Sequence, residues 1–214
     1  MRKRHRRKSP KVVWGIGIGL LLLLGSWIGI SCRQHALSES TSDIFLDHVV
    51  YYAQKDVRWK EDPLGDSIYH MGDSGCLTTC LAAVFQMQGI ERDTLGKTVN
   101  PKTLNQFFST HGIYDAEGNL LWYALEDTLD MTVIRKEADE LKEGELDTLL
   151  EQGYYPIACV HGAGTGRMHF VLLVGKADGV YWCMDPVQQE ETAVPLSKYG
   201  NSFDSIRYLT ENRT

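Results

Sequence analysis

Three residues of this chain, a thiol, an imidazole and a carboxylate, occur in contexts that could bring them together as a nucleophilic site. The thiol is Cys76, which follows Ser74-Gly75 and begins a run with helical patterning. The imidazole is His169 and the carboxylate is Asp185, each at one end of a strand-like segment far downstream. A base that is oriented by a carboxylate and reaches a thiol can produce a thiolate nucleophile for acyl transfer.

The pattern after Cys76 predicts a helix that begins at this residue. The apolar positions that repeat with helical spacing are Leu77, Cys80, Leu81, Val84 and Phe85. This spacing predicts one buried face of a helix over 76–88, with Gly89 as its C-cap. Unpaired N–H groups and the positive end of the helix dipole favour a thiolate at Cys76. A free cysteine is also often a small core residue, and that alternative stays open for Cys76.

His169 belongs to an apolar segment that ends in Gly175 and predicts a strand buried on both faces. Asp178-Gly179 is a hairpin signal, so the next strand should return antiparallel. Its end, Asp185-Pro186, then lies beside the start of the first strand. Asp185 could accept a hydrogen bond from one ring nitrogen of His169, leaving the other nitrogen to face the sulfur of Cys76.

Each of these residues also has an ordinary structural interpretation. His169 could be a core histidine that is hydrogen-bonded to backbone. Asp185-Pro186 could simply be a turn that ends a strand. His161 is a rival base, ranked second because it lies on the other side of the glycine-rich loop 162–166. We interpret Cys80 as core packing, since it lies on the apolar stripe and its spacing from Cys76 exceeds that of a Cys-x-x-Cys pair.

Four motifs together carry a resemblance to a known family. They are Gln54-Lys-Asp56-Val-Arg58-Trp59, Ser74-Gly75-Cys76-Leu-Thr-Thr, Met168-His169-Phe-Val-Leu-Leu-Val-Gly175 and Asp185-Pro186. From about Val49 to Leu209 the chain resembles the bacteriocin-leader-peptidase-like family, a bacterial branch of the papain-fold cysteine peptidases. The resemblance implies Cys76 as nucleophile, His169 as general base, Asp185 as the residue that orients the base, and Gln54 as an oxyanion donor.

Gln54 departs from the papain pattern because it stands 22 residues before Cys76, a longer separation than in that pattern. It can return to the site only if residues 59–71 loop out, and otherwise it is an exposed polar residue at a strand end. Asp56, Arg58 and Trp59 are interpreted as structural, a buried indole with a nearby ion pair. We expect no cofactor and no metal, because the ligand spacing of a Cys76, Cys80 and histidine zinc site is poor.

Composition predicts a basic cytoplasmic segment at 1–11, a transmembrane signal anchor at 12–30 and a stem at 31–46. The resemblance implies a peptidase domain at 47–214. Seven of the first eleven residues are Lys or Arg, and residues 12–30 form a 19-residue run without charge. As a helix this run measures about 28 Å, enough to cross a bilayer. The positive-inside rule then places the domain outside the cytoplasm, in a single-pass protein of the cell membrane.

Two other fates of the N-terminal segment remain open in the sequence: cleavage that releases a secreted protein, and lipid attachment at Cys32. The chain beyond residue 11 has 15 basic and 28 acidic residues, a formal charge of −13, which argues against nucleic-acid binding. Its cysteines do not form a disulfide scaffold. Cys159 and Cys183 are too far apart to bridge if their strands flank that of His169 on opposite sides.

Early helices that carry the nucleophile and late antiparallel strands that carry base and acid predict an α+β fold. The resemblance implies that this fold is papain-like. Helices are expected at 76–88, 101–109, 121–128 and 145–152, and strands at 49–52, 131–135, 155–160, 170–174, 179–184 and 205–209. The predicted function is a membrane-anchored extracytoplasmic cysteine peptidase that acts on a peptide or protein through an acyl-thioester. The alternatives are a cell-wall amidase or transpeptidase on the same fold, and a catalytically inactive peptide-binding module; the oligomeric state stays open.

Overall fold

A computed structural model describes residues 43–45, 48–90, 98–162 and 166–211 of the chain. Its strands are β1 (Ile44–Phe45), β2 (Met131–Glu137), β3 (Ile157–His161), β4 (Met168–Ala177), β5 (Val180–Met184), β6 (Val194–Pro195) and β7 (Ser205–Glu211). Its α-helices are α2 (Met71–Ser74), α3 (Cys76–Met87), α4 (Pro101–Thr110), α5 (Trp122–Leu129) and α6 (Glu145–Glu151), and two short 3-10 helices are η1 (Ala138–Glu140) and η2 (Leu196–Tyr199).

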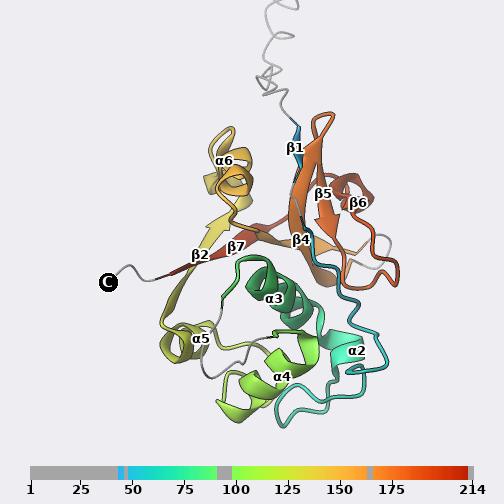
Figure 1. Ribbon diagram of the computed structural model, residues 1–214, viewed down its shortest axis with the longest axis vertical. Coiled ribbons are helices and arrows are strands. Elements are labelled where there is room, and N and C mark those ends of the chain that lie inside the picture. Colours follow the sequence, from blue (N-terminus) through green and yellow to red (C-terminus); the bar gives the residue numbers. More distant parts are fainter. Residues whose placement is uncertain (1–42, 46–47, 91–97, 163–165, 212–214) are drawn as a thin grey trace, which may run out of the picture. The chain divides into compact units, whose positions relative to one another are not determined.

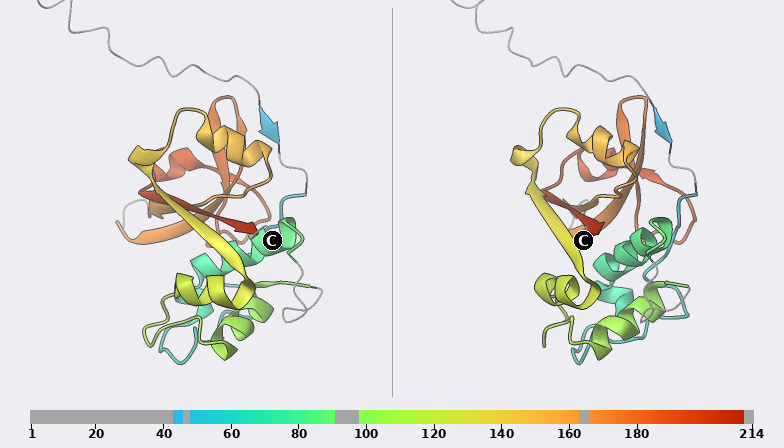
Figure 2. Two further views of the ribbon diagram at one scale, coloured as in Figure 1. Left: turned by 90° about the vertical axis from the view of Figure 1, so that its left-hand side faces the viewer. Right: turned by 60° about the vertical axis from the view of Figure 1, so that its left-hand side comes forward.

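The strands form one sheet in the order β2-β7-β3-β4-β5-β6, with β1 paired to β4, and every pairing is antiparallel. Figure 1 shows helices α2 to α5 gathered at one end of the domain and the β3 to β6 part of the sheet with α6 at the other. Figure 2 shows the same division from two further directions. In both views β2, the edge strand of the sheet, extends toward α5. The α+β class expected from the order of elements is therefore confirmed.

Strand β4 separates two hydrophobic cores. Leu172 and Val174 belong to the core that contains α3, α4 and α5. Val171 and Leu173 belong to the core that contains α6. Alternate residues of a strand point to opposite faces of a sheet, so this single strand contributes to both cores. The prediction of a strand buried on both faces, made from the apolar run after His169, is confirmed.

The predicted helices and the five later strands all occur, with ends that differ by a few residues at most. Asp178 and Gly179 both have positive φ, 50° and 74°, and they join β4 to β5 as the hairpin signal predicted. Gly89 has φ of 63° and follows α3, while Ile90 N–H donates to the Phe85 carbonyl over 3.0 Å. That bond closes the helix end in the way expected of a C-terminal glycine.

The strand predicted at 49–52 is wrong. Residues 49–52 have no strand partner, and the short strand β1 lies earlier, at Ile44–Phe45, where it pairs with β4. Val49 to Tyr52 instead pack their side chains against the core around α3. A segment whose apolar and β-branched side chains pack on a core has the same sequence pattern as a strand. The pattern indicates that the side chains are buried, but it does not indicate whether the backbone pairs with another strand.

Helix α2 precedes α3 directly, and Gly75 is the junction between them. Its φ is −83°, so it does not need glycine for its backbone conformation. A Cβ at this position would lie 2.5 Å from the Met71 carbonyl oxygen and 2.8 Å from the Met71 Cα. Glycine is therefore needed for the close approach of backbone to backbone, which sets where the next residue, Cys76, begins its helix.

In the part of the chain that the structure describes, no helix is long and apolar enough to span a membrane. The predicted transmembrane segment 12–30 and residues 31–42 of the predicted stem 31–46, including Cys32, lie outside the described residues. Residues 44 and 45 of that stem form β1. Membrane anchoring therefore stays a prediction.

Candidate active site

Cys76 is the first residue of α3 and lies half-buried at the helix tip. Cys80, one turn later, is fully buried, and its thiol donates to the Phe170 carbonyl over 3.6 Å. Burial raises the pKa of Cys80 well above its ordinary value, with a further rise from the charges of Cys76 and Asp185. The interpretation of Cys80 as a core residue is confirmed. The interpretation of Cys76 as a buried core residue is not supported by its partial exposure.

His169 and Asp185 meet as the hairpin register requires. In the β4–β5 pairing Leu172 lies opposite Met184, so the next residues bring the end of β5 beside the start of β4. His169 Nε2 lies 2.8 Å from Asp185 Oδ1. The two side chains are 13% and 0% exposed, respectively. A hydrogen bond with this little solvent contact holds the ring in one orientation.

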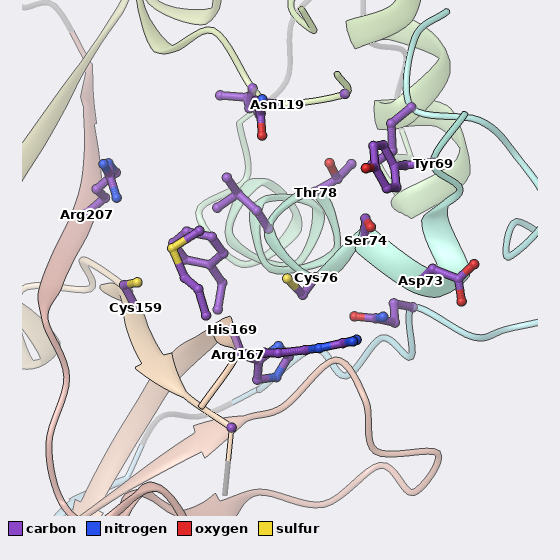
Figure 3. Close-up of a pocket in the computed structure, with 18 of the residues that line it drawn as sticks. Tyr69, Asp73, Ser74, Cys76, Thr78, Asn119, Cys159, Arg167, His169 and Arg207 are labelled. Atoms are coloured by element: carbon purple, nitrogen blue, oxygen red, sulfur yellow. The ribbon is translucent and has the colours of Figure 1, made fainter. Parts of the chain in front are cut away.

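The other side of the imidazole faces Cys76. Figure 3 shows the Cys76 side chain and the His169 ring at the same part of the pocket. Burial lowers the pKa of His169, but hydrogen bonds to Asp185 and Cys76, with the charges of both, raise the pKa to about 9. Because Nε2 is bound to Asp185, Nδ1 is the nitrogen left for the sulfur. The structure therefore brings together three of the predicted site residues.

Asp185 is held by more partners than the sequence indicated. Lys198 Nζ donates to Asp185 Oδ2 over 2.8 Å, and the Tyr199 hydroxyl donates to the same oxygen. The Val187 N–H donates to Oδ1 over 3.1 Å. Burial raises the pKa of Asp185, but hydrogen bonds from His169, Lys198 and Tyr199 lower it well below the usual range. The carboxylate is thus kept ionised although it has no exposed surface.

Lys198 and Tyr199, in η2 and at its end, were missed by the sequence analysis. They follow a two-residue strand and precede Gly200, a context without a recognisable motif. The one available signal was indirect. A carboxylate expected to be buried beside an imidazole needs further donors, and the nearest downstream residues that could supply them are a lysine and a tyrosine.

Gln54 is 4% exposed and lies against both halves of the site, so the alternative of an exposed residue at a strand end is wrong. Its backbone N–H donates to the Pro186 carbonyl over 2.8 Å, next to Asp185. Its side-chain Nε2 donates to the Gly72 carbonyl over 2.9 Å, four residues before Cys76. One of the two Nε2 hydrogens is used in this bond, and the amide borders the same pocket as Cys76.

The residues between Gln54 and Cys76 form a loop whose two ends are joined by hydrogen bonds. Residues 60 and 62 accept hydrogen bonds from Gly72 and Met71, both over 2.9 Å, so the chain leaves and returns at the same place. Trp59 anchors the start: its indole is 2% exposed and Nε1 donates to the Ala53 carbonyl over 2.9 Å. Arg58 pairs with Asp56 beside it. The expected looping-out and the structural interpretation of these three residues are confirmed.

The rival base, His161, forms a second histidine–carboxylate pair. His161 Nε2 lies 2.8 Å from Asp204 Oδ2, but the side chains are 55% and 54% exposed. A bond to the Gly166 carbonyl raises the pKa of His161, and Asp204 adds to the rise. Cys76 helps to raise the pKa of His169 but does not contribute to the raised pKa of His161. His169 is therefore the imidazole that the structure associates with the thiol.

The site opens into a pocket of about 1130 Å³ that is bordered by both halves of the domain. Cys76 and Gln54 come from the helical half, and His169 comes from the sheet. Partly exposed apolar side chains, Tyr69, Met168 and Val187, lie on its border. A concave pocket with an apolar border and a few polar groups is the usual form of a ligand site.

The other cysteines agree with the sequence analysis. Cys159 lies on β3 and Cys183 on β5, which flank β4 on opposite sides, and both are free. Burial raises the pKa of Cys183 to about 12. Among the described residues no group of three or more His, Cys, Asp or Glu side chains is arranged to hold a metal ion.

A comparison with solved structures identifies the fold. The domain resembles the crystal structure of a candidate C39-like peptidase from Bacillus anthracis, with a TM-score of 0.51 and 15% sequence identity over 80% of this chain and 100% of that chain. The chain thus has the fold of a C39-like peptidase. No protein-family model matches the chain, and no curated protein does. The finer resemblance to bacteriocin leader peptidases is not shown by the fold.

We predict that His169 titrates near pH 9 in the wild-type protein and at lower pH in Asp185→Asn, because that change removes the charge that stabilises the buried imidazolium. Since this pKa lies above the ordinary 6.5, imidazolium pairing stabilises the fold fully below about pH 6.5 and is lost as pH rises through about 9. Histidine ring NMR signals followed against pH measure the titration. Asp204→Asn is the matched control and should leave the His169 titration unchanged. Equal behaviour of the two variants would contradict the orienting role of Asp185.

Proposed function

We propose that the protein is a cysteine peptidase that hydrolyses peptide bonds through Cys76, His169 and Asp185. The observation that carries the proposal is the buried His169–Asp185 hydrogen bond, with the Cys76 side chain at the same part of the pocket as the His169 ring (Figure 3). The peptidase fold supports it independently. In this arrangement the carboxylate fixes the ring, and the ring is placed to exchange a proton with the sulfur of Cys76.

The reaction begins when the Cys76 sulfur attacks the carbonyl carbon of the substrate and a C–S bond forms. The carbonyl oxygen becomes an oxyanion in a tetrahedral intermediate. The intermediate collapses as the C–N bond breaks and the His169 imidazolium gives its proton to the leaving amine. Water, deprotonated by the now neutral His169, then attacks the thioester carbon. The C–S bond breaks, the carboxylic acid leaves, and the thiolate and imidazolium are restored.

The oxyanion needs donors that are placed before the reaction starts. The Cys76 backbone N–H at the tip of α3 is one donor, and the Gln54 side-chain amide is the other. The support for Gln54 is its burial, its place on the pocket border and the Nε2 hydrogen not used by the Gly72 carbonyl. Amide donors held in a site with little water stabilise an oxyanion strongly because they need no reorganisation.

Cys76→Ala should remove hydrolysis of peptides completely while the melting temperature stays within about 2 °C of wild type, because a half-buried helix-tip sulfur contributes little packing. Peptide mixtures, purified cell-wall muropeptides and added amine acceptors form the assay panel, read by mass spectrometry. Release of peptide fragments supports the peptidase, whereas products formed only from muropeptides or amines favour an amidase or transpeptidase. If the wild-type protein forms no thioester adduct at Cys76 with any substrate of the panel, the protein is instead a catalytically inactive peptide-binding module.

Gln54→Ala should lower kcat about 100-fold with little change in KM, because the lost donor acts mainly on the oxyanion. Steady-state rates on a peptide identified in the panel measure the two constants. Gln106→Ala, on the exposed side of α4, is the matched control and should keep wild-type rates. The reverse pattern, a raised KM with unchanged kcat, would mean that Gln54 only supports the chain around Gly72.

We also propose that residues 12–30 tether the domain to the outer face of the cell membrane. The support is the charge-free run of 19 residues after a segment with seven Lys or Arg. The full chain should stay in the membrane fraction after alkaline carbonate washing, and protease added to intact spheroplasts should digest the domain. Release by the wash, together with a mature N-terminus beyond residue 30, would instead show cleavage and secretion.

A further inference from the structure

Two arginines lie opposite each other at the part of the pocket formed by β2 and β7. Arg135 and Arg207 are Cα partners in the antiparallel ladder, and both border the same pocket as Cys76. Figure 3 shows Arg207 on its strand, facing the pocket that Cys76 faces from the tip of α3. Like charges directly opposite in a ladder destabilise a sheet, so this pair opposes folding.

Arg207 is half-buried, and its guanidinium lies 4.8 Å from the centre of the Trp122 ring. Among the described residues, no group accepts a hydrogen bond from the Arg207 guanidinium, and no carboxylate forms a salt bridge with it. Burial lowers the pKa of Arg207, and the charge of Arg135 lowers it further. A guanidinium stacked on an aromatic ring keeps the N–H groups at its edge for a planar acceptor.

The acidic side chains near Arg207 are already engaged. Glu137 pairs with Arg135, with Oε1 and Nη1 2.5 Å apart. Asp204, on the border of the pocket, is bonded to His161 over 2.8 Å. Arg207 therefore has no carboxylate of its own, because Glu137, whose charge also acts on it, already pairs with Arg135. This is notable in a chain whose part beyond residue 11 is strongly acidic. A positive group that costs folding free energy and lacks a partner is suited to a ligand of opposite charge.

We propose that Arg207, with Arg135 and Trp122, forms a subsite of the peptidase groove that binds a carboxylate of the peptide substrate. This inference rests on the proposed peptidase function and names the substrate class, peptides that carry a carboxylate at a set distance from the cleaved bond. Two sources of the group fit this chemistry, an Asp or Glu side chain and a free peptide C-terminus. The planar fork of arginine donors matches a carboxylate in both cases.

The test uses the full-length chain in detergent and two randomised dodecapeptide libraries. One library contains Asp and Glu, and the other has Asn and Gln in their place. Each library is made with a free and with an amidated C-terminus. Mass spectrometry of the products should show either Asp or Glu enriched at one position from the cleaved bond, or cleavage at a fixed distance from free C-termini only. The first result assigns the carboxylate to a side chain and the second to the terminus.

Arg207→Gln should lower kcat/KM for the best carboxylate peptide about tenfold or more, mainly through KM, since a charged hydrogen bond is lost. The same variant should cleave the matched amide peptide at the wild-type rate. Arg135→Gln, at an exposed position, should produce a smaller loss of the same kind. Lys102→Gln removes one positive charge from the exposed surface of α4 and should change neither substrate. Equal losses on both peptides, or no preference in the wild type, would overturn the subsite.

Binding to Cys76→Ala separates this inference from the proposed function. If the wild type cleaves neither library, the peptidase proposal fails, but the inactive variant can still be used to capture library peptides. Carboxylate peptides retained over their amide counterparts, and not retained by the Cys76→Ala, Arg207→Gln double variant, support the subsite even then. Equal retention of the two libraries by Cys76→Ala rejects it. Arg207→Lys keeps the positive charge and should retain part of the preference for carboxylate peptides. This variant shows whether the loss of binding in Arg207→Gln comes from misfolding.

Discussion

The site depends on one ionised carboxylate that has no contact with solvent. Asp185 is 0% exposed on its side chain, and it is kept charged by His169, Lys198 and Tyr199. A buried charge is tolerated only where it is paired and fully hydrogen-bonded, so these donors are a requirement of burial. The same bonds determine the orientation of the imidazole. Stability and the chemistry at Cys76 therefore rest on one set of contacts.

The fold places this set by combining two kinds of local geometry. The β4–β5 hairpin brings His169 and Asp185 together through its antiparallel pairing and the register shift between Leu173 and Gly175, which puts both residues on the same face of the sheet. The thiol arrives from another direction, on α3, whose packing against Leu172 and Val174 of β4 fixes the helix relative to the strand. Because both elements share one core, a change in core packing would also alter the distance between sulfur and ring.

The sequence predicted this site well where geometry is local. Helix periodicity located the start of α3 at Cys76, and Asp178-Gly179 located the hairpin. It failed where side chains from distant segments meet. Lys198 and Arg207 have no periodic or turn signal, because their roles come only from what the folded chain puts beside them. The error at 49–52 has a related cause, since apolar residues packed on a core and apolar residues paired in a sheet look the same in sequence.

The two histidine–carboxylate pairs of this domain differ in burial, and this difference favours His169 over His161 as the base of the proposed peptidase. His161 and His169 both lie 2.8 Å from their carboxylates. The His161 pair is more than half exposed, so water screens its charges and the ring can turn away without losing solvation. The His169 pair is enclosed, so the field of Asp185 acts on the ring with little screening and the ring cannot rotate without breaking a buried bond. A thiol beside the enclosed ring meets a fixed, charged imidazole, and only that arrangement suits proton transfer to and from a nucleophile.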